Sequence, residues 1–177
     1  GGLLGLLKWD ANNSYVVGMW NDLAKGIANA NDAIDRVQDN AQVSLSTQQR
    51  VIGEAKFLRA YYLNYAVQFW GDYPIVLHNV EGSSVERQPV DAVYAQIEQD
   101  LLDAAEELPA SYGSTDLGRA TRGAAWALLS KVYLTWGQVS PTFSEAERKA
   151  KYAQAVEAAN QVTGYALEED FSANWDN

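Results

Sequence analysis

Apolar residues recur every three or four positions in five successive segments of this chain, and this spacing constrains the fold more than any other feature. Such spacing places side chains on one face of an α-helix, so each segment predicts an amphipathic helix. The predicted helices span residues 16–37, 48–70, 90–108, 122–136 and 144–162. Only YPIVLH, from Tyr73 to His78, is typical of an extended segment, and it is too short to found a sheet. The sequence therefore predicts one all-α domain over residues 1–177.

Residues that favour helix ends lie between these segments. Gly71 and Gly164 follow the second and fifth segments, and Pro89 and Pro109 bracket the third. Glycine commonly ends helices, and proline is accepted in a first turn but not in a helix interior. Ser, Thr and Asn side chains can cap the first backbone N–H groups of a helix. The expected caps are Asn13 or Ser14 for the first helix, Ser46 or Thr47 for the second, and Thr121 for the fourth.

The stretch YGSTDLGRATRG, residues 112–123, contains Gly113 and Gly118. These two glycines are separated by four residues, which raises the question of a phosphate-binding loop. Such a loop follows a strand and has a lysine and then a hydroxyl residue directly after its second glycine. Here the stretch follows a predicted helix, Arg119 replaces the lysine and Ala120 replaces the hydroxyl residue. We therefore expect a helix opening capped by Thr121, with Arg119 and Arg122 bracing the turn through helix-end carbonyls or a nearby carboxylate.

Two of the predicted helices share an internal repeat. A shift of 66 residues places LNYAVQFWG (63–71) over LSKVYLTWG (129–137), and both segments begin with Leu and end in Trp-Gly. The shift is close to two units of about 34 residues, the length of a tetratricopeptide repeat. Helical hairpins of this kind stack side by side and bury a shared core. The repeat predicts tetratricopeptide-like helical hairpins.

The composition argues against several classes of function. Without cysteine the chain can form no disulfide, thiol nucleophile or thiolate metal site. Its 23 acidic and 13 basic residues give a net charge of -10, which disfavours binding to nucleic acid. His78 is the one histidine, so no histidine metal cluster can form and a catalytic triad would depend on it alone. We expect no catalytic activity, cofactor or metal.

Five segments together carry a family resemblance, because they follow one another in a characteristic order. They are MWNDLAKGIANANDAIDRV (19–37), EAKFLRAYYLNYAVQFWGDYPIV (54–76), VDAVYAQIEQDLLDAAEELP (90–109), GRATRGAAWALLSKVYLTWG (118–137) and YALEEDFSANW (165–175). This order resembles the helical part of SusD/RagB-type proteins, in which Gly-Arg-Ala-Thr opens a tetratricopeptide-like helix. The resemblance covers nearly the whole chain.

The resemblance implies a surface-exposed lipoprotein of the outer membrane of Bacteroidota-type bacteria. Such a protein captures oligosaccharides or other nutrients and passes them to a TonB-dependent, SusC-like transporter without breaking a bond. Family members are much longer and carry a lipid-bearing N-terminal Cys, which this sequence lacks. We therefore expect a piece of a longer polypeptide. Two alternatives remain open: a helical-repeat scaffold that binds a protein and no sugar, and an α-helical glycosidase, which needs two carboxylates across a cleft.

Sugar sites pair a flat aromatic face with Asn, Asp or Arg side chains that bond to hydroxyl groups. Loop aromatics beside such residues are therefore the candidates for ligand contact. They are Trp9 with Asp10 and Asn12, Tyr73 with His78 and Asn79, and Trp175 with Asn174. Packing against a core is the commoner use of each ring.

Aromatic residues inside the predicted helices are expected to be core. They lie on or beside the apolar stripes at helical spacing. They are Tyr61, Tyr65, Phe69, Trp126 and Trp136.

Overall fold

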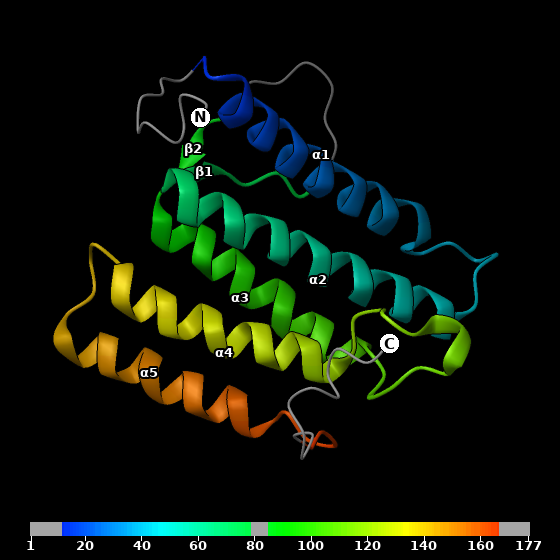
Figure 1. Cartoon of the computed structure of the whole chain (residues 1–177). Coiled ribbons are helices and arrows are strands. Elements are labelled where there is room, and N and C mark those ends of the chain that lie inside the picture. The colour runs from blue at the N-terminus through cyan, green and yellow to red at the C-terminus, as the bar shows by residue number, and fades with distance from the viewer. Residues whose placement is uncertain (1–11, 79–84, 167–177) are drawn as a thin grey trace, which may run out of the picture.

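The computed structural model describes residues 12–78 and 85–166, which form a row of antiparallel helices (Figure 1). The helices are α1 (Ser14–Val37), α2 (Leu45–Trp70), α3 (Val90–Glu107), α4 (Arg122–Val139) and α5 (Glu145–Asn160). Two short strands, β1 (Tyr73–Pro74) and β2 (Arg87–Gln88), and one 3₁₀ turn, η1 (Ser114–Asp116), complete the described elements. The predicted all-α, tetratricopeptide-like fold is confirmed.

Each helix packs against the next one along the chain, and α2 lies between α1 and α3 (Figure 1). Small residues allow the close approach. A Cβ atom on Gly26 of α1 would lie 2.6 Å from the ring of Tyr62 on α2. A Cβ atom on Gly137 of α4 would lie 2.8 Å from the ring of Tyr152 on α5. The fourth helix therefore does not end before Gly137, as the predicted range had it, but continues to Val139. Gly137 lies inside the helix, where the absence of a side chain allows α5 to pack closely.

The helix caps agree with the sequence except in one place. Asn13 Oδ1 accepts a hydrogen bond from Tyr15 N, and Thr121 Oγ1 accepts one from Ala124 N. The second helix begins earlier than predicted, because Ser44 is its cap: Ser44 Oγ accepts a hydrogen bond from Thr47 N at 3.3 Å.

The aromatic residues of α2 correct another expectation. Tyr61, Tyr65 and Phe69 are 39%, 38% and 59% exposed, whereas Trp136 is 6% exposed and belongs to the core as predicted. The buried positions of α2 instead carry mostly smaller side chains, such as Ala60. Spacing of four residues drifts around a helix of 3.6 residues per turn, so the aromatic row turns away from both neighbours. Trp126 is half-buried and packs against the core.

The predicted extended segment forms a strand only at its beginning. Tyr73 and Pro74 pair with Gln88 and Arg87 in an antiparallel ladder. Asp72 precedes the strand and accepts a hydrogen bond from Val90 N, at the start of α3, through Oδ1 at 3.0 Å. The ladder therefore ties the end of α2 to the start of α3, next to α1 (Figure 1).

The stretch 112–123 is a braced turn. Arg119 bonds to Asp116 through Nε at 2.7 Å and to Glu54 of α2 through Nη1 at 2.9 Å. Tyr112 donates its hydroxyl hydrogen to the other oxygen of Glu54 at 2.9 Å. Burial, with this hydrogen bond, raises the pKa of Tyr112 to about 12. The expectation that Arg119 braces the turn through a nearby carboxylate is confirmed.

Arg148 of α5 closes the carboxyl end of α4. Its Nη1 donates to the carbonyls of Gly137 and Gln138 at 2.8 Å each, and its Nη2 donates to the carbonyl of Ser140 at 2.6 Å. The last carbonyls of a helix have no partner within the helix, so a cation at this end satisfies them.

Replacing Arg148 by Ala is expected to lower the free energy of unfolding by about 1.5–3 kcal/mol, because hydrogen bonds to a charged donor are lost. Urea denaturation followed by circular dichroism measures this change. Lys149→Ala is the matched control, since Lys149 is exposed and pairs with Glu145 on its own helix. Its effect should stay within about 0.5 kcal/mol. Equal effects of the two substitutions would refute the role of Arg148.

Candidate functional site

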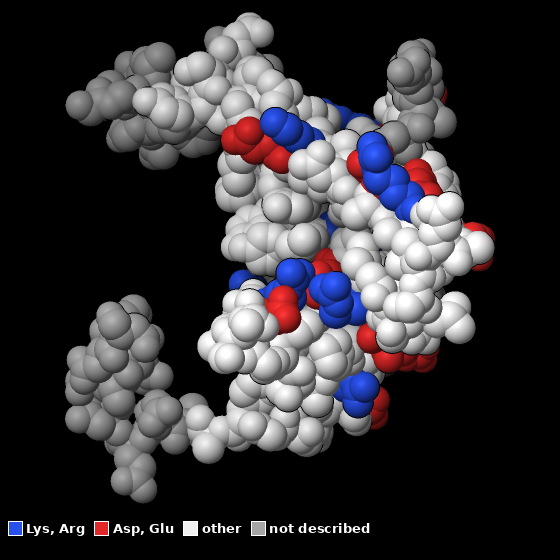
Figure 2. Space-filling model, turned by 90° about the vertical axis from the view of Figure 1, so that its right-hand side faces the viewer, with Lys and Arg blue, Asp and Glu red and all other residues white. Residues whose placement is uncertain are grey.

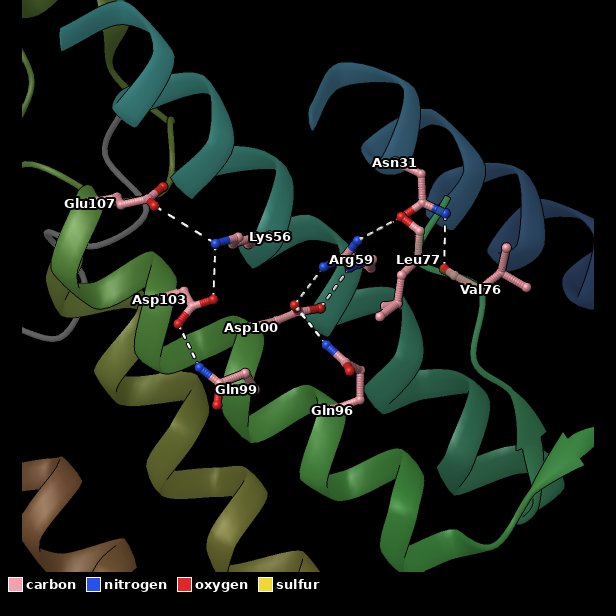
Figure 3. Close-up of polar contacts among 10 residues, drawn as sticks. All are labelled: Asn31, Lys56, Arg59, Val76, Leu77, Gln96, Gln99, Asp100, Asp103 and Glu107. Carbon is pink, nitrogen blue, oxygen red and sulfur yellow. Dashed lines mark hydrogen bonds and ion pairs between the residues drawn. The ribbon is translucent and has the colours of Figure 1, made fainter. Parts of the chain in front are cut away.

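A buried ion pair joins α2 to α3 beneath the segment that follows α2 (Figure 3). Arg59 and Asp100 are 5% and 1% exposed. Arg59 Nε donates to Asp100 Oδ2 at 2.8 Å, and Arg59 Nη2 donates to Asp100 Oδ1 at 2.7 Å. Gln96 adds a third hydrogen bond to Asp100 at 3.0 Å. This bidentate geometry provides hydrogen-bond partners for both charged groups, which are buried from water.

The same network holds the chain after β1. Arg59 Nη1 donates to Asn31 Oδ1 at 2.9 Å and to the carbonyl of Leu77 at 3.3 Å. Asn31, fully buried on α1, donates its amide to the carbonyl of Val76 at 2.9 Å (Figure 3). Backbone carbonyls outside regular structure need such partners when they lie against a core. The network therefore fixes the extended segment between α1 and α2.

His78 lies in the same segment, directly after Leu77. Its Nδ1 lies 2.8 Å from Asp35 Oδ1 of α1, and its side chain is 70% exposed. The contact continues the attachment of the segment to α1.

Trp20 of α1 is the centre of an aromatic cluster beside this segment. Its ring centroid lies 5.3 Å from that of Trp70, at the end of α2, in a perpendicular arrangement. It lies 4.6 Å from the ring of Tyr73, on β1. Trp20 and Trp70 are each half-buried, whereas Tyr73 is 3% exposed. Burial raises the pKa of the Tyr73 hydroxyl.

Two cavities meet at Trp20, and we call them together the Trp20 groove. The first, of about 260 Å³, is lined by Val16, Val17, Trp20, Trp70 and Arg87. The second, of about 410 Å³, lies between α1 and the extended segment. Its lining includes Trp20, Ala24, Asn31, Tyr73, Pro74 and Val85. Arg87 of β2 is exposed and places its guanidinium carbon 5.6 Å from the centre of the Trp20 ring.

The chemistry of the Trp20 groove suits a ligand that has apolar faces and hydrogen-bond acceptors such as hydroxyl groups. Indole rings offer flat apolar surfaces, and the guanidinium of Arg87 offers hydrogen-bond donors. Among the described residues, neither cavity is lined by Asp or Glu, so the described lining does not contain the two carboxylates that a glycosidase needs. The described part of the chain also holds no group of three His, Asp or Glu side chains that could bind a metal ion.

The described residues among those that the sequence nominated do not lie together in one site. Trp9, Asp10, Asn79, Asn174 and Trp175 lie outside the described residues.

The nominated residues within the described part have three different environments. Asn12 is exposed just before α1. His78 lies with Asp35, as described above. Tyr73 packs against Trp20 and Trp70 as a core ring, the commoner use expected for each candidate ring, and it also lines the second cavity.

Trp20 falls within the first predicted helix and Trp70 at the end of the second, and no sequence motif singled out Arg87. A useful signal was present for Trp70, because it directly precedes Gly71 and the extended segment. Trp20 and Arg87 are 67 positions apart, and only the β1–β2 pairing shows that they meet.

Opposite charges lie close together on the surface. On the face in Figure 2, Lys and Arg side chains lie beside Asp and Glu side chains. Examples are the ion pairs of Arg36 with Asp32, at 2.7 Å, and of Lys56 with Asp103, at 2.9 Å. None of the described helices has the length and apolar composition needed to cross a bilayer.

Comparison with known proteins adds a family context. Residues 7–134 match the SusD-like_3 family, described as starch-binding and associating with the outer membrane. The chain is 32% identical to SusD-like protein P25 of Formosa agariphila over 120 residues, which make up 65% of this chain and 22% of that protein.

Two solved structures share the fold at 30% sequence identity. A SusD superfamily protein from Parabacteroides distasonis superimposes with a TM-score of 0.77 over 90% of this chain and 34% of that chain. A laminarin-binding SusD-like protein superimposes with a TM-score of 0.74 over 89% of this chain and 34% of that chain. The chain spans 22% of the length of the curated relatives it matches.

Proposed function

Because the chain belongs to the SusD-like family, we propose that it is a glycan-binding protein whose oligosaccharide site is the Trp20 groove. The observation that carries the proposal is the pair of cavities that meet at one half-buried indole beside an exposed guanidinium. A sugar ring can pack its C–H face on the indole, while its hydroxyl groups accept hydrogen bonds from Arg87.

The site binds and does not cleave in this account. Support comes from the lining of the two cavities, in which no described Asp or Glu lies. The family description supports a place at the outer membrane, and the resemblance supports hand-over of the ligand to a TonB-dependent, SusC-like transporter. Co-purification with such a transporter, through a tag on this protein, tests the partner.

The first test is a calorimetric titration of the 177-residue chain with starch-, laminarin-, mannan- and xylan-derived oligosaccharides. We expect saturable binding to at least one class and no release of shorter products on incubation. Arg87→Ala should weaken that binding by about tenfold or more, because a charged hydrogen-bond donor is lost. Arg36→Ala is the control, since Arg36 is exposed on α1 and pairs with Asp32 outside both cavities.

A protein-interaction scaffold without sugar binding is the second candidate. The observation that favours it is the exposed aromatic row of α2, formed by Tyr61, Tyr65 and Phe69. The rings of Tyr61 and Tyr65 lie 5.0 Å apart, and those of Tyr65 and Phe69 lie 6.5 Å apart. A flat titration across the whole panel would favour the scaffold, whereas binding that Arg87→Ala weakens favours the Trp20 groove.

A further inference from the structure

A second groove lies between α3, α4 and α5, and none of its lining residues belongs to the Trp20 groove. Its volume is about 240 Å³. Trp126 and Tyr133 of α4 form its aromatic wall. Gln154 and Glu157 of α5, with Gln161 directly after that helix, form its polar wall. We call it the Trp126 groove.

The polar wall has free hydrogen-bonding capacity. The side-chain amides of Gln154 and Gln161 form no hydrogen bond within the part of the chain that the structure describes. Each amide offers two donors and one acceptor. Gln154, Glu157 and Gln161 are spaced by three and four positions, so they follow one side of α5. This side therefore presents two unpaired amides and a carboxylate to the same groove.

The aromatic wall is held rigidly. Tyr133 donates its hydroxyl hydrogen to Glu98 Oε1 of α3 at 2.7 Å, and burial, with this bond, raises its pKa. Lys151 Nζ lies 4.7 Å from the centre of the Tyr133 ring and 3.2 Å from Glu98 Oε2. Trp126 is half-buried and packs against the core. A ligand therefore meets rings whose positions are already fixed, which reduces the entropy lost on binding.

The charge of the described lining disfavours an anionic ligand. Glu157 is the one charged side chain in the described lining, and neither Lys nor Arg is part of it. A carboxylate accepts hydrogen bonds from hydroxyl groups and repels anions. The volume is below the range of about 300–1,000 Å³ that drug-sized ligands occupy, so the groove suits a ligand of one ring.

We propose that the Trp126 groove is a second carbohydrate subsite, which holds one neutral sugar ring between the indole of Trp126 and the amides of Gln154 and Gln161. It lies on different helices from the Trp20 groove and rests on its own residues. A chain with two such subsites can contact one glycan at two separate places or two glycans at once.

The test is an NMR titration of the isotope-labelled 177-residue chain with maltohexaose and, separately, with laminarihexaose. The indole N–H of Trp126 and the side-chain amides of Gln154 and Gln161 report on the proposed subsite, and the indole N–H of Trp20 reports on the other groove. We expect saturable shifts at the first three groups with at least one of the two sugars. The double variant Gln154→Ala/Gln161→Ala should weaken that binding on the order of tenfold, since two neutral hydrogen bonds are lost.

The response at Trp20 should be the same in the double variant as in the parent chain. Gln138→Ala serves as the matched control, because Gln138 is exposed on α4 outside this groove and should change neither response. Shifts at Trp126 without shifts at Trp20 would support this subsite and contradict the proposed Trp20 site. The inference is overturned if the Trp126 groove does not respond to either sugar, or if the double variant binds there as tightly as the parent chain.

Discussion

Replacing Asp100 by Ala is expected to lower the free energy of unfolding by about 3–5 kcal/mol. Asp100 is 1% exposed and accepts two hydrogen bonds from Arg59, which is itself 5% exposed. Without Asp100 the guanidinium remains buried with no opposite charge beside it. Its remaining partners, Asn31 Oδ1 and the carbonyl of Leu77, are neutral. Denaturation by guanidinium chloride, followed by circular dichroism, measures the change in the free energy of unfolding.

The neighbouring carboxylate gives a matched control. Asp103 lies one turn further along α3 and pairs with Lys56 at 2.9 Å, but both side chains keep contact with solvent. Asp103→Ala should therefore cost about 1 kcal/mol or less. The double variant Arg59→Met/Asp100→Leu should recover part of the loss, because it removes both charges and keeps the volume but leaves Asn31 Oδ1 and the carbonyl of Leu77 without their donor. If Asp100→Ala costs no more than Asp103→Ala, the buried pair does not anchor this region.

Replacing Trp20 by Ala is expected to weaken oligosaccharide binding by about 10- to 100-fold, since the apolar contact of a large side chain contributes roughly 1.5–3 kcal/mol. Trp20 lines both cavities of its groove, so its loss removes the shared wall. Calorimetric titration with the sugar that the parent chain binds measures the change. Arg87→Ala should weaken binding to the same sugar without altering the core, because Arg87 is exposed.

Two further substitutions separate lost contact from lost folding. Trp20→Phe keeps a smaller aromatic face in the same position and should retain part of the affinity. Tyr15→Ala removes a ring on the same helix that is 71% exposed and lines neither cavity, so affinity should not change. A Trp20→Ala chain that keeps its helical circular dichroism and its full affinity would remove the sugar site from this groove.

The helices were predictable because their apolar spacing is local. A stripe of three and four residues, followed by a cap such as Thr121, depends only on neighbours along the chain. Which face of α2 is buried and which is exposed was not predictable in this way. Tyr61 and Phe69 are large and apolar, but the buried positions of α2 carry mostly smaller residues, such as Ala60. Close packing of two helices favours a small residue on one of them, on α2 itself or on its neighbour as at Gly26 of α1, and aromatic spacing does not report which.

The type of candidate site was predictable from the sequence, but most of its residues were not. The expectation of aromatic rings beside polar side chains agrees with the proposed Trp20 groove, yet Tyr73 is the one nominated residue among its described lining. The sequence gives no local sign that Arg87 approaches Trp20, since this depends on the pairing of Pro74 with Arg87. Nor does it show that Arg59 finds Asp100, which lies 41 positions away on the next helix.

The fold and the proposed site are linked through one segment of the chain. The Arg59–Asp100 pair and Asn31 hold the carbonyls of Val76 and Leu77, and this segment forms one wall of the larger cavity beside Trp20. Loosening the network should therefore reduce affinity as well as stability, although it does not touch the ligand. A rigid helical frame with its binding side chains fixed in advance suits a protein that captures and releases a ligand unchanged.

A crystal structure of the chain with the oligosaccharide that it binds most tightly tests the central claim most directly. We predict a sugar ring packed on the indole of Trp20, with at least one hydroxyl group within hydrogen-bond distance of the Arg87 guanidinium. An ordered sugar that contacts neither Trp20 nor Arg87 would contradict the claim.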